Sequence, residues 1–104
     1  MRPVSDPTIR LRARWQGEAI EVTALMIHPM QTGMRRDADG TIIPAHFIRE
    51  FEVRCQDRPV LQGQLSISIS EDPLLRFGFR SGAPGERIDL IWTDNLGETR
   101  SASL

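Results

Sequence analysis

Apolar and polar residues alternate one by one along much of this 104-residue chain, and the alternation restricts the folds that it can adopt. In residues 8–15 the odd positions from Ile9 to Trp15 are apolar, whereas arginine occupies positions 10, 12 and 14. Successive side chains of a β-strand point to opposite faces, so this pattern is typical of a strand with one buried and one wet face. The sequence therefore predicts a β-protein.

The same pattern returns at short intervals, without a convincing 3.6-residue period. In residues 20–27 the apolar residues stand at even positions as far as Ala24 and at odd positions from Leu25 onward. This change predicts a β-bulge or a strand end buried on both faces. Residues 44–49 are the one segment that could hold a helical turn. Seven or eight short strands predict an immunoglobulin-like antiparallel β-sandwich. Beyond the first strand, they are expected at residues 20–27, 47–55, 60–64, 65–70, 75–79, 88–92 and 98–104, with turns at 57–59, 81–85 and 94–97.

Length and composition favour one domain. With 104 residues, 39% of them hydrophobic, the chain can bury a single core, so residues 8–104 are expected to form one β-sandwich domain. Residues 1–7 contain two prolines and are expected to be a disordered lead-in. Cys55 is the only cysteine, so an internal disulfide is excluded. Because Cys55 falls on an apolar strand face, we expect it to pack as a small buried hydrophobe.

The charge of the chain excludes some classes of partner. A net charge of -1 and a pI near 6.1 argue against a protein that wraps nucleic acid or coats an anionic membrane. All 13 basic residues are arginine, which favours forked contacts to carboxylates or oxyanions, although coding bias produces the same composition. The sequence shows no apolar export segment, so by itself it predicts a soluble, cytoplasmic protein.

One long connection, residues 28–44, interrupts the strands. Connections this long, without structure of their own, are uncommon in compact domains and usually bind or catalyse. Asp37-x-Asp39-Gly40 begins like a calcium loop, but placing Gly40 sixth leaves Arg35 first and His46 last, so the required ligands are missing. We expect instead an Asx-type turn in which Asp39 and Gly40 reverse the chain.

Candidate chemistry elsewhere in the chain is sparse. His28, His46 and Cys55 could in principle hold zinc or copper, but their spacing matches no ligand pattern, so a metalloprotein or enzyme is kept only as an alternative. We expect His28 to hydrogen-bond loop carbonyls. No nucleophile with a base and no phosphate loop is recognisable, so no catalytic residue, metal or cofactor is predicted. Met30 and Met34 suit an adaptable partner surface. An adhesion-type or sugar-binding sandwich is a further alternative.

The residue pattern of the whole loop resembles that of a known protein family. The pattern His28-Pro29-Met30-x-Thr32-Gly33-x-Arg35-x-Asp37-x-x-Gly40-x-x-x-Pro44 resembles the signature loop of SoxZ, the small subunit of the SoxYZ carrier complex of bacterial sulfur oxidation. The resemblance extends more loosely to residues 47–53, to 91–94 and to Gly97. It implies an immunoglobulin-like β-sandwich that is not itself an enzyme and binds no cofactor. Together with Arg36, the fixed positions of this pattern form the candidate docking loop.

The resemblance also implies a partner and a compartment. In the family, SoxY carries thiosulfate-derived sulfur on a C-terminal Gly-Gly-Cys-Gly-Gly arm between periplasmic Sox enzymes, and SoxZ is its tightly bound companion. Residues 101–104 contain no such arm, so we expect the companion and not the carrier. SoxZ-like chains are exported with a signal-bearing partner, so the expected location becomes the periplasm. Arg35 or Arg36 is expected to meet sulfonate oxygens near the carrier's arm. No contact with nucleic acid or membrane is expected.

Overall fold

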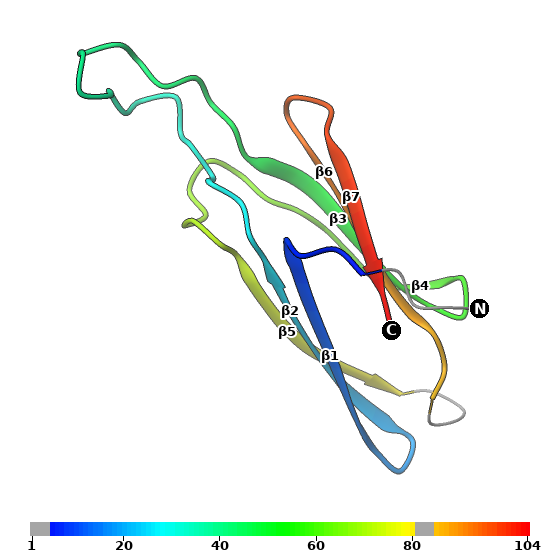
Figure 1. Ribbon diagram of the computed structural model, residues 1–104. Coiled ribbons are helices and arrows are strands. Elements are labelled where there is room, and N and C mark those ends of the chain that lie inside the picture. Colours follow the sequence, from blue (N-terminus) through cyan, green and yellow to red (C-terminus); the bar gives the residue numbers. More distant parts are fainter. Residues whose placement is uncertain (1–4, 81–84) are drawn as a thin grey trace.

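Seven antiparallel strands form two facing sheets in the computed structural model, which describes residues 5–80 and 85–104 (Figure 1). The described residues contain no helix, and so none long and apolar enough to cross a membrane. One sheet has the order β1-β2-β5 and the other the order β4-β3-β6-β7. The strands are β1 (Ile9–Gln16), β2 (Ala19–Met26), β3 (Ile48–Cys55), β4 (Arg58–Gln64), β5 (Leu74–Arg80), β6 (Ile88–Asp94) and β7 (Thr99–Ser103).

This strand order is that of an immunoglobulin-like sandwich. Hairpins join β1 to β2, β3 to β4 and β6 to β7, whereas the chain changes sheet between β2 and β3, between β4 and β5 and between β5 and β6. Such crossovers produce the Greek-key connections of this architecture. The single β-sandwich predicted from the alternation is confirmed.

The core lies between the sheets and consists of the inward-facing residues of each strand. On β1 and β2 the inward phase is the apolar one that the sequence shows, and Ile20, Val22 and Ala24 are completely enclosed. Trp92 of β6 is the largest fully buried side chain. Burying apolar area of this kind contributes about 25 cal/mol per Å². The sandwich is therefore held together chiefly by these rows.

Of the two alternatives predicted for residues 20–27, a β-bulge or a strand end buried on both faces, the β-bulge is wrong. Strand β2 pairs residue for residue with β1 and with β5, and its inward phase simply continues from Ala24 to the buried Met26. Leu25 belongs to the outer face, where it is half-buried. The register shifts lie in β3 instead, between Ile48 and Glu50 toward β6 and between Val53 and Arg54 toward β4.

The strand predicted at residues 65–70 is also wrong. The Ser66 hydroxyl lies 2.6 Å from the Ser68 hydroxyl and accepts the Ser68 amide at 3.3 Å, while the Ile69 amide donates to the Ser66 carbonyl. Serine side chains offer the backbone local partners that compete with a sheet ladder. The segment therefore forms an irregular connection, although Leu65 and Ile69 still pack against the core.

Other local predictions shift by a few residues or fall outside the described ranges. The first turn predicted at 57–59 lies at Gln56 and Asp57, both with positive φ (51° and 65°), so β4 already begins at Arg58. Residues 44–49 form no helical turn, because His46 pairs with Gln31 and the chain then enters β3. The turn predicted at 81–85 lies largely outside the described residues, as do residues 1–4 of the predicted lead-in.

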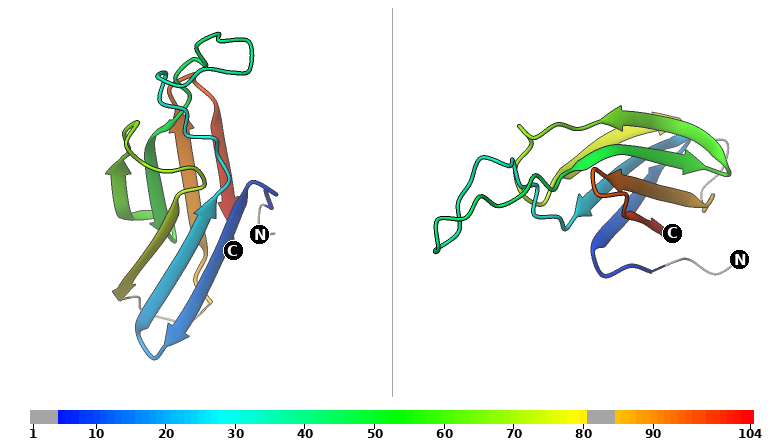
Figure 2. Two further views of the ribbon diagram at one scale, coloured as in Figure 1. Left: turned by 90° about the vertical axis from the view of Figure 1, so that its left-hand side faces the viewer. Right: turned by 90° about the horizontal axis from the view of Figure 1, so that it is seen from above.

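The long connection between β2 and β3 projects past the ends of both sheets (Figures 1 and 2). It is not without structure, because its two halves pair with each other. Gln31 and His46 exchange two backbone hydrogen bonds, of 2.6 and 2.9 Å, and farther out the Ile43 amide donates to the Arg35 carbonyl at 2.8 Å. We call residues 31–46 the arm. It is an irregular hairpin that stands out from the sandwich.

Candidate functional site

The arm starts from a buried cluster of His28, His46 and Asp94, which come from three separate parts of the chain. His28 follows β2, His46 precedes β3, and Asp94 is the last residue of β6. The side chains of His28 and Asp94 are 3% and 0% exposed, whereas that of His46 is 29% exposed. The sequence places Asp94 there because it continues the inward phase of Leu90 and Trp92 along β6.

Asp94 accepts hydrogen bonds through both carboxylate oxygens. Oδ2 lies 2.8 Å from Nε2 of His46 and 3.3 Å from Nε2 of His28. Oδ1 accepts the backbone amides of Leu96 at 3.0 Å and Glu98 at 2.9 Å. The two imidazole rings meet edge to face, with centroids 4.5 Å apart. One carboxylate thus joins the β6–β7 hairpin to both ends of the arm.

The contacts of His28 determine which ring nitrogen carries its proton. The backbone amide of Met30 donates to Nδ1 of His28 at 3.0 Å, so a neutral His28 has its proton on Nε2 and donates it to Asp94. Burial lowers the pKa of His28, and its hydrogen bond to Asp94 opposes that shift without cancelling it. His28 is therefore neutral at pH 7.

The Asp94 carboxylate is ionised in this cluster. Burial by itself would raise the pKa of Asp94, but the hydrogen bonds from His46, the Glu98 amide, His28 and the Leu96 amide outweigh burial and lower the pKa below 3.8. Together, His28, His46 and Asp94 hold the base of the arm in place, and we call this cluster the brace. Both carboxylate oxygens of Asp94 and Nδ1 of His28 already accept hydrogen bonds, so these two buried side chains offer no open acceptor to a substrate.

The same contacts weigh against a metal ion in the cluster. The ligand atoms of His28, His46 and Asp94 lie within 4.8 Å of one another, so their spacing alone would suit one. Coordination through Nε2 of His28 would move the ring proton to Nδ1, and the Met30 amide would lose its acceptor. Cys55 lies at the opposite end of β3, where its Sγ contacts Glu86 at 3.4 Å. The donor set considered from the sequence is therefore not assembled.

Two further side chains hold the base of the arm. Asn95 accepts the Phe47 amide at 2.8 Å and donates to the Ala45 carbonyl at 2.8 Å. On the other side, the Asp72 carboxylate accepts the His28 amide at 3.0 Å, and the Asp72 amide donates to the His28 carbonyl. These bonds tie each end of the arm to a neighbouring turn, so its direction is fixed by the sandwich.

The tip of the arm is an Asx turn, as the sequence predicts, but its acceptor is a different aspartate. Asp37 Oδ1 accepts the amides of Asp39 at 2.9 Å and Thr41 at 3.0 Å. Gly40 has a φ of 80°, a conformation that glycine adopts without strain, and its carbonyl accepts Nη1 of Arg36 at 2.7 Å. Asp37 and Gly40 therefore shape the tip.

The residues predicted to dock a partner divide into a buried and an exposed group. His28 and Met30 are 3% and 4% exposed, and the Met30 sulfur accepts the Ile48 amide at 3.3 Å, so both belong to the base. Thr32 and Gly33 are half-buried. Exposed on the arm and its base are Pro29, Arg35, Arg36, Asp37, Gly40 and Pro44, accompanied by Met34 and Ile42. This exposed group offers the largest accessible surface to another molecule, whereas the buried His28 and Met30 offer almost none.

Sequence reasoning missed Asp94 and Asn95. Both stand in the predicted turn at 94–97, where turn chemistry explains them fully. The alternation along β6 does place Asp94 on the buried face, in line with Leu90 and Trp92. Because a buried carboxylate needs hydrogen-bond donors, this position could have indicated contacts with distant residues. The donors are the only two histidines of the chain, but sequence distances of 66 and 48 residues conceal the contacts.

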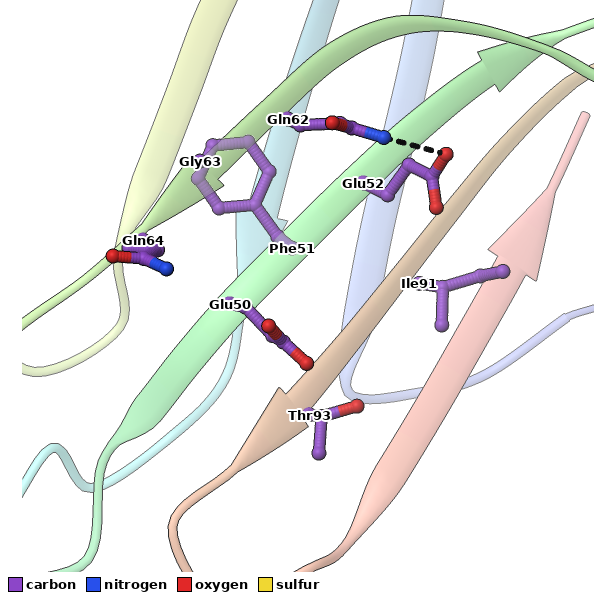
Figure 3. A pocket seen from close by; sticks show the side chains of 8 residues that line it. All are labelled: Glu50, Phe51, Glu52, Gln62, Gly63, Gln64, Ile91 and Thr93. Carbon is purple, nitrogen blue, oxygen red and sulfur yellow. Dashed lines mark hydrogen bonds between the residues drawn. The ribbon is translucent and has the colours of Figure 1, made fainter.

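A hollow of about 420 Å³ lies on the outer face of the four-stranded sheet (Figure 3). Phe51 lines the hollow but belongs to the core, and its ring packs against Gly63, where an added Cβ would lie 2.5 Å from ring carbons. Glu52 accepts Nε2 of Gln62 at 3.1 Å. Among the described residues, this is the one hydrogen bond between lining side chains, and the lining contains no histidine, cysteine or serine that could act as a nucleophile or imidazole base. It is lined by Glu50, Phe51, Glu52, Gln62, Gly63, Gln64, Ile91 and Thr93.

The lowered pKa of His28 predicts how stability depends on pH. Because folded His28 binds a proton less tightly than the unfolded residue, its contribution is complete above the unfolded value of 6.5 and is lost as pH falls toward the folded pKa. We expect the free energy of unfolding to fall below pH 6.5 by up to about 1.4 kcal/mol per pH unit. Urea denaturation at a series of pH values measures this.

Two single variants separate His28 from His46 in that experiment. His28→Gln removes the buried imidazole and should flatten the profile below pH 6.5. His46→Gln keeps His28 buried and should retain most of the slope. An equally steep profile in His28→Gln would contradict the assignment.

Comparison with known proteins places the chain in context. A family model described as "Sulphur oxidation protein SoxZ" matches residues 9–104, which contain all seven strands and the arm. A search of curated proteins gave no match. Among solved structures, the chain is similar to a superoxide reductase in the oxidised state, with 12% identity and a TM-score of 0.55 over 100% of this chain and 88% of that chain. At that identity the similarity shows the fold alone.

Proposed function

Since this chain belongs to the SoxZ family of sulfur oxidation proteins, we propose that it is the non-catalytic partner subunit of a SoxY-like sulfur carrier. In this role it forms a heterodimer with the carrier and helps present the cysteine-bound sulfur intermediate to the oxidising enzymes. The supporting observation is the family match over residues 9–104, including the arm. The heterodimer acts in the periplasm, which the chain reaches with a signal-bearing partner.

The chemistry of the described residues supports recognition more than catalysis. The buried His28 and Asp94 are committed to the brace, and Cys55, which is 1% exposed, contacts Glu86. A reactive thiol needs exposure and a positive environment, and a general base needs access to its substrate. The molecule instead presents to solvent an arm that is fixed at its base and carries both apolar and charged side chains.

The exposed part of the arm suits contact with the carrier and its cargo. Met34 is 75% exposed and Ile42 50%, and both offer apolar surface to a partner. Arg35 has no side-chain hydrogen bond or ion pair among the described residues, and Arg36 bonds only the neighbouring Gly40 carbonyl. Guanidinium groups bind sulfonate and carboxylate oxygens through paired N–H donors. We therefore assign the docking role to the arm, beside the sulfur-loaded cysteine of the carrier.

Removing both arginines of the arm should impair turnover without unfolding the protein. We expect Arg35→Ala with Arg36→Ala to lower sulfur turnover by the reconstituted pathway about tenfold, which corresponds to losing one charge-assisted contact of about 1.4 kcal/mol. Both side chains are exposed, so the urea midpoint should not move. The matched control is Arg49→Ala with Arg58→Ala, two exposed arginines of the four-stranded sheet. Unchanged turnover in the arm variant would refute the docking role.

Reconstitution tests the proposed function itself. Thiosulfate oxidation should require the carrier, its processing enzymes and this chain together, and omission of this chain should abolish it. The chain alone should show no turnover. If the carrier were processed equally well without this chain, the role of partner subunit would be wrong.

A further inference from the structure

The outer face of the β1-β2-β5 sheet carries five arginines. Three alternate along β1 and two lie on β5, and all five are exposed. One acidic residue, Glu21 of β2, shares this face, which leaves four net positive charges. We call this surface the arginine face. The left panel of Figure 2 views its three strands in front of the other sheet. Its arginines are Arg10, Arg12, Arg14, Arg76 and Arg80.

Strand register arranges these arginines along both edges of the sheet. Thr23 of β2 is paired with Arg12 on one side and Arg76 on the other, and Ala19 is paired with Arg80. Alternate residues of a strand lie about 7 Å apart and neighbouring strands about 5 Å apart. The guanidinium groups thus flank the outer face of β2, whose one charged residue is Glu21, over an area that a few carboxylates of another protein could cover.

These charges differ from those of the opposite sheet in how they are paired. On the outer face of the four-stranded sheet, Arg54 binds Glu52 at 3.1 Å, and the guanidinium of Arg87 binds Asp89 at 2.8 Å. On the arginine face, Arg76 binds Glu21 at 3.1 Å, and the other four arginines have no ion pair within the described ranges. The whole chain has a net charge of -1, so it has no general excess of positive charge. The positive charge of this face therefore reflects an uneven distribution of charge over the surface.

We propose that the arginine face is a docking surface for an acidic protein surface on the enzymes that process the sulfur-loaded complex. This inference rests on the proposed function, since it assumes that the complex visits such enzymes. Guanidinium groups bind carboxylates through paired donors, and complementary charge steers encounter more than it raises final affinity. The outward residues of this face include no aromatic side chain on which a nucleic-acid base could stack, so an acidic protein is the better fit.

Edge protection does not account for this face. An edge strand needs only a charge or two to prevent pairing with another sheet. Here both edges carry arginines that have no ion pair to another described residue, and Glu21 is the one acidic residue on this face of the three strands. A solubilising surface normally intersperses both signs of charge, as the opposite sheet does. The arrangement fits a face that is neutralised by a partner.

The test neutralises two arginines of β1 and measures turnover of the reconstituted complex by each purified enzyme. Arg12→Gln with Arg14→Gln changes the net charge by two, and Arg49→Gln with Arg58→Gln makes the same change on the opposite sheet. We expect the β1 variant to raise KM about three- to tenfold at low ionic strength for at least one enzyme, with kcat unchanged. The difference should largely disappear near 0.5 M salt, where the Debye length is only a few ångströms.

Other outcomes would overturn the inference in distinguishable ways. An unchanged KM, or an equal change in both variants, would show that the face has no specific role. Loss of the 1:1 complex with the carrier in the β1 variant would assign the face to the subunit interface. Binding of a single-stranded DNA oligonucleotide, or self-association in sedimentation, that disappears in the β1 variant would assign it to another partner. Absence of any carrier complex in the unaltered protein would instead refute the proposed function.

Discussion

Replacing Asp94 with alanine should destabilise the protein by about 3–4 kcal/mol, because removing one partner of a buried charged network leaves its donors unsatisfied. Asp94 is 1% exposed and accepts four hydrogen bonds, two from histidine rings and two from backbone amides of the β6–β7 turn. Leu96 and Glu98 are exposed residues of the turn, so we expect water to replace the lost acceptor of their amides. Water cannot easily reach His28, so most of the loss arises there.

Two variants calibrate that result. Asp94→Asn keeps an oxygen for the turn amides but presents an amide group to two imidazole donors, so we expect a smaller loss of about 1–2 kcal/mol. Asp39→Ala removes an exposed carboxylate at the tip of the arm and should change the free energy of unfolding by less than about 0.5 kcal/mol. Urea denaturation of the three variants gives the values. An effect of Asp94→Ala no larger than that of Asp39→Ala would contradict the account of the brace.

The second large effect is expected from Trp92→Ala, with a loss of about 3–5 kcal/mol. The Trp92 side chain is the largest in the core, is 2% exposed and meets the His28 ring edge to face, with centroids 5.2 Å apart. Truncation to alanine removes this packing and opens a cavity beneath the base of the arm. The loss should appear as a lower urea midpoint with an unchanged slope.

Trp92→Phe tests whether the loss comes from packing. The Nε1–H of Trp92 is buried and has no hydrogen-bond partner among residues 5–80 and 85–104, which is itself unfavourable. Phenylalanine fills much of the same volume and has no such group, so Trp92→Phe should cost less than about 1.5 kcal/mol. A loss as large as that of Trp92→Ala would mean that the indole has a specific role beyond filling the core.

The sequence predicted strands best where one face of the strand is exposed to solvent and the other is buried. In β1 the alternation of arginine with apolar residues predicted both the strand and its buried face to within one residue. The pattern misled at residues 65–70, where serine alternates with apolar residues in the same way. Hydropathy cannot distinguish a serine that lines a sheet from one that bonds its own backbone, as Ser66 does.

The candidate site was predictable only in part. The local chemistry of Asp and Gly predicted that a turn would end the arm, although Asp37 and not Asp39 is the acceptor. The brace was not predictable, because His28 and Asp94 meet only after the two sheets pack. Turn propensity at 94–97 also gave Asp94 a sufficient local explanation, which concealed its long-range contacts.

The resemblance to the SoxZ family lies mainly in the loop pattern, and the structure explains part of that pattern physically. Gly40 and Asp37 form the turn, while His28 and Met30 occupy buried places at the base. A signature that looks like a binding loop therefore mixes residues that build the arm with residues that it exposes. Sequence alone cannot separate them, because burial of the loop depends on the surrounding sheets.

Determining the mass of the complex formed with the carrier tests the central claim most directly. This chain would be co-expressed with a SoxY-like protein that ends in Gly-Gly-Cys-Gly-Gly, purified through a tag on the carrier, and analysed by native mass spectrometry. We predict a 1:1 heterodimer that persists through purification and dilution, as expected of an obligate interface. Recovery of the carrier without this chain, or of two separate species at micromolar concentration, would contradict the account.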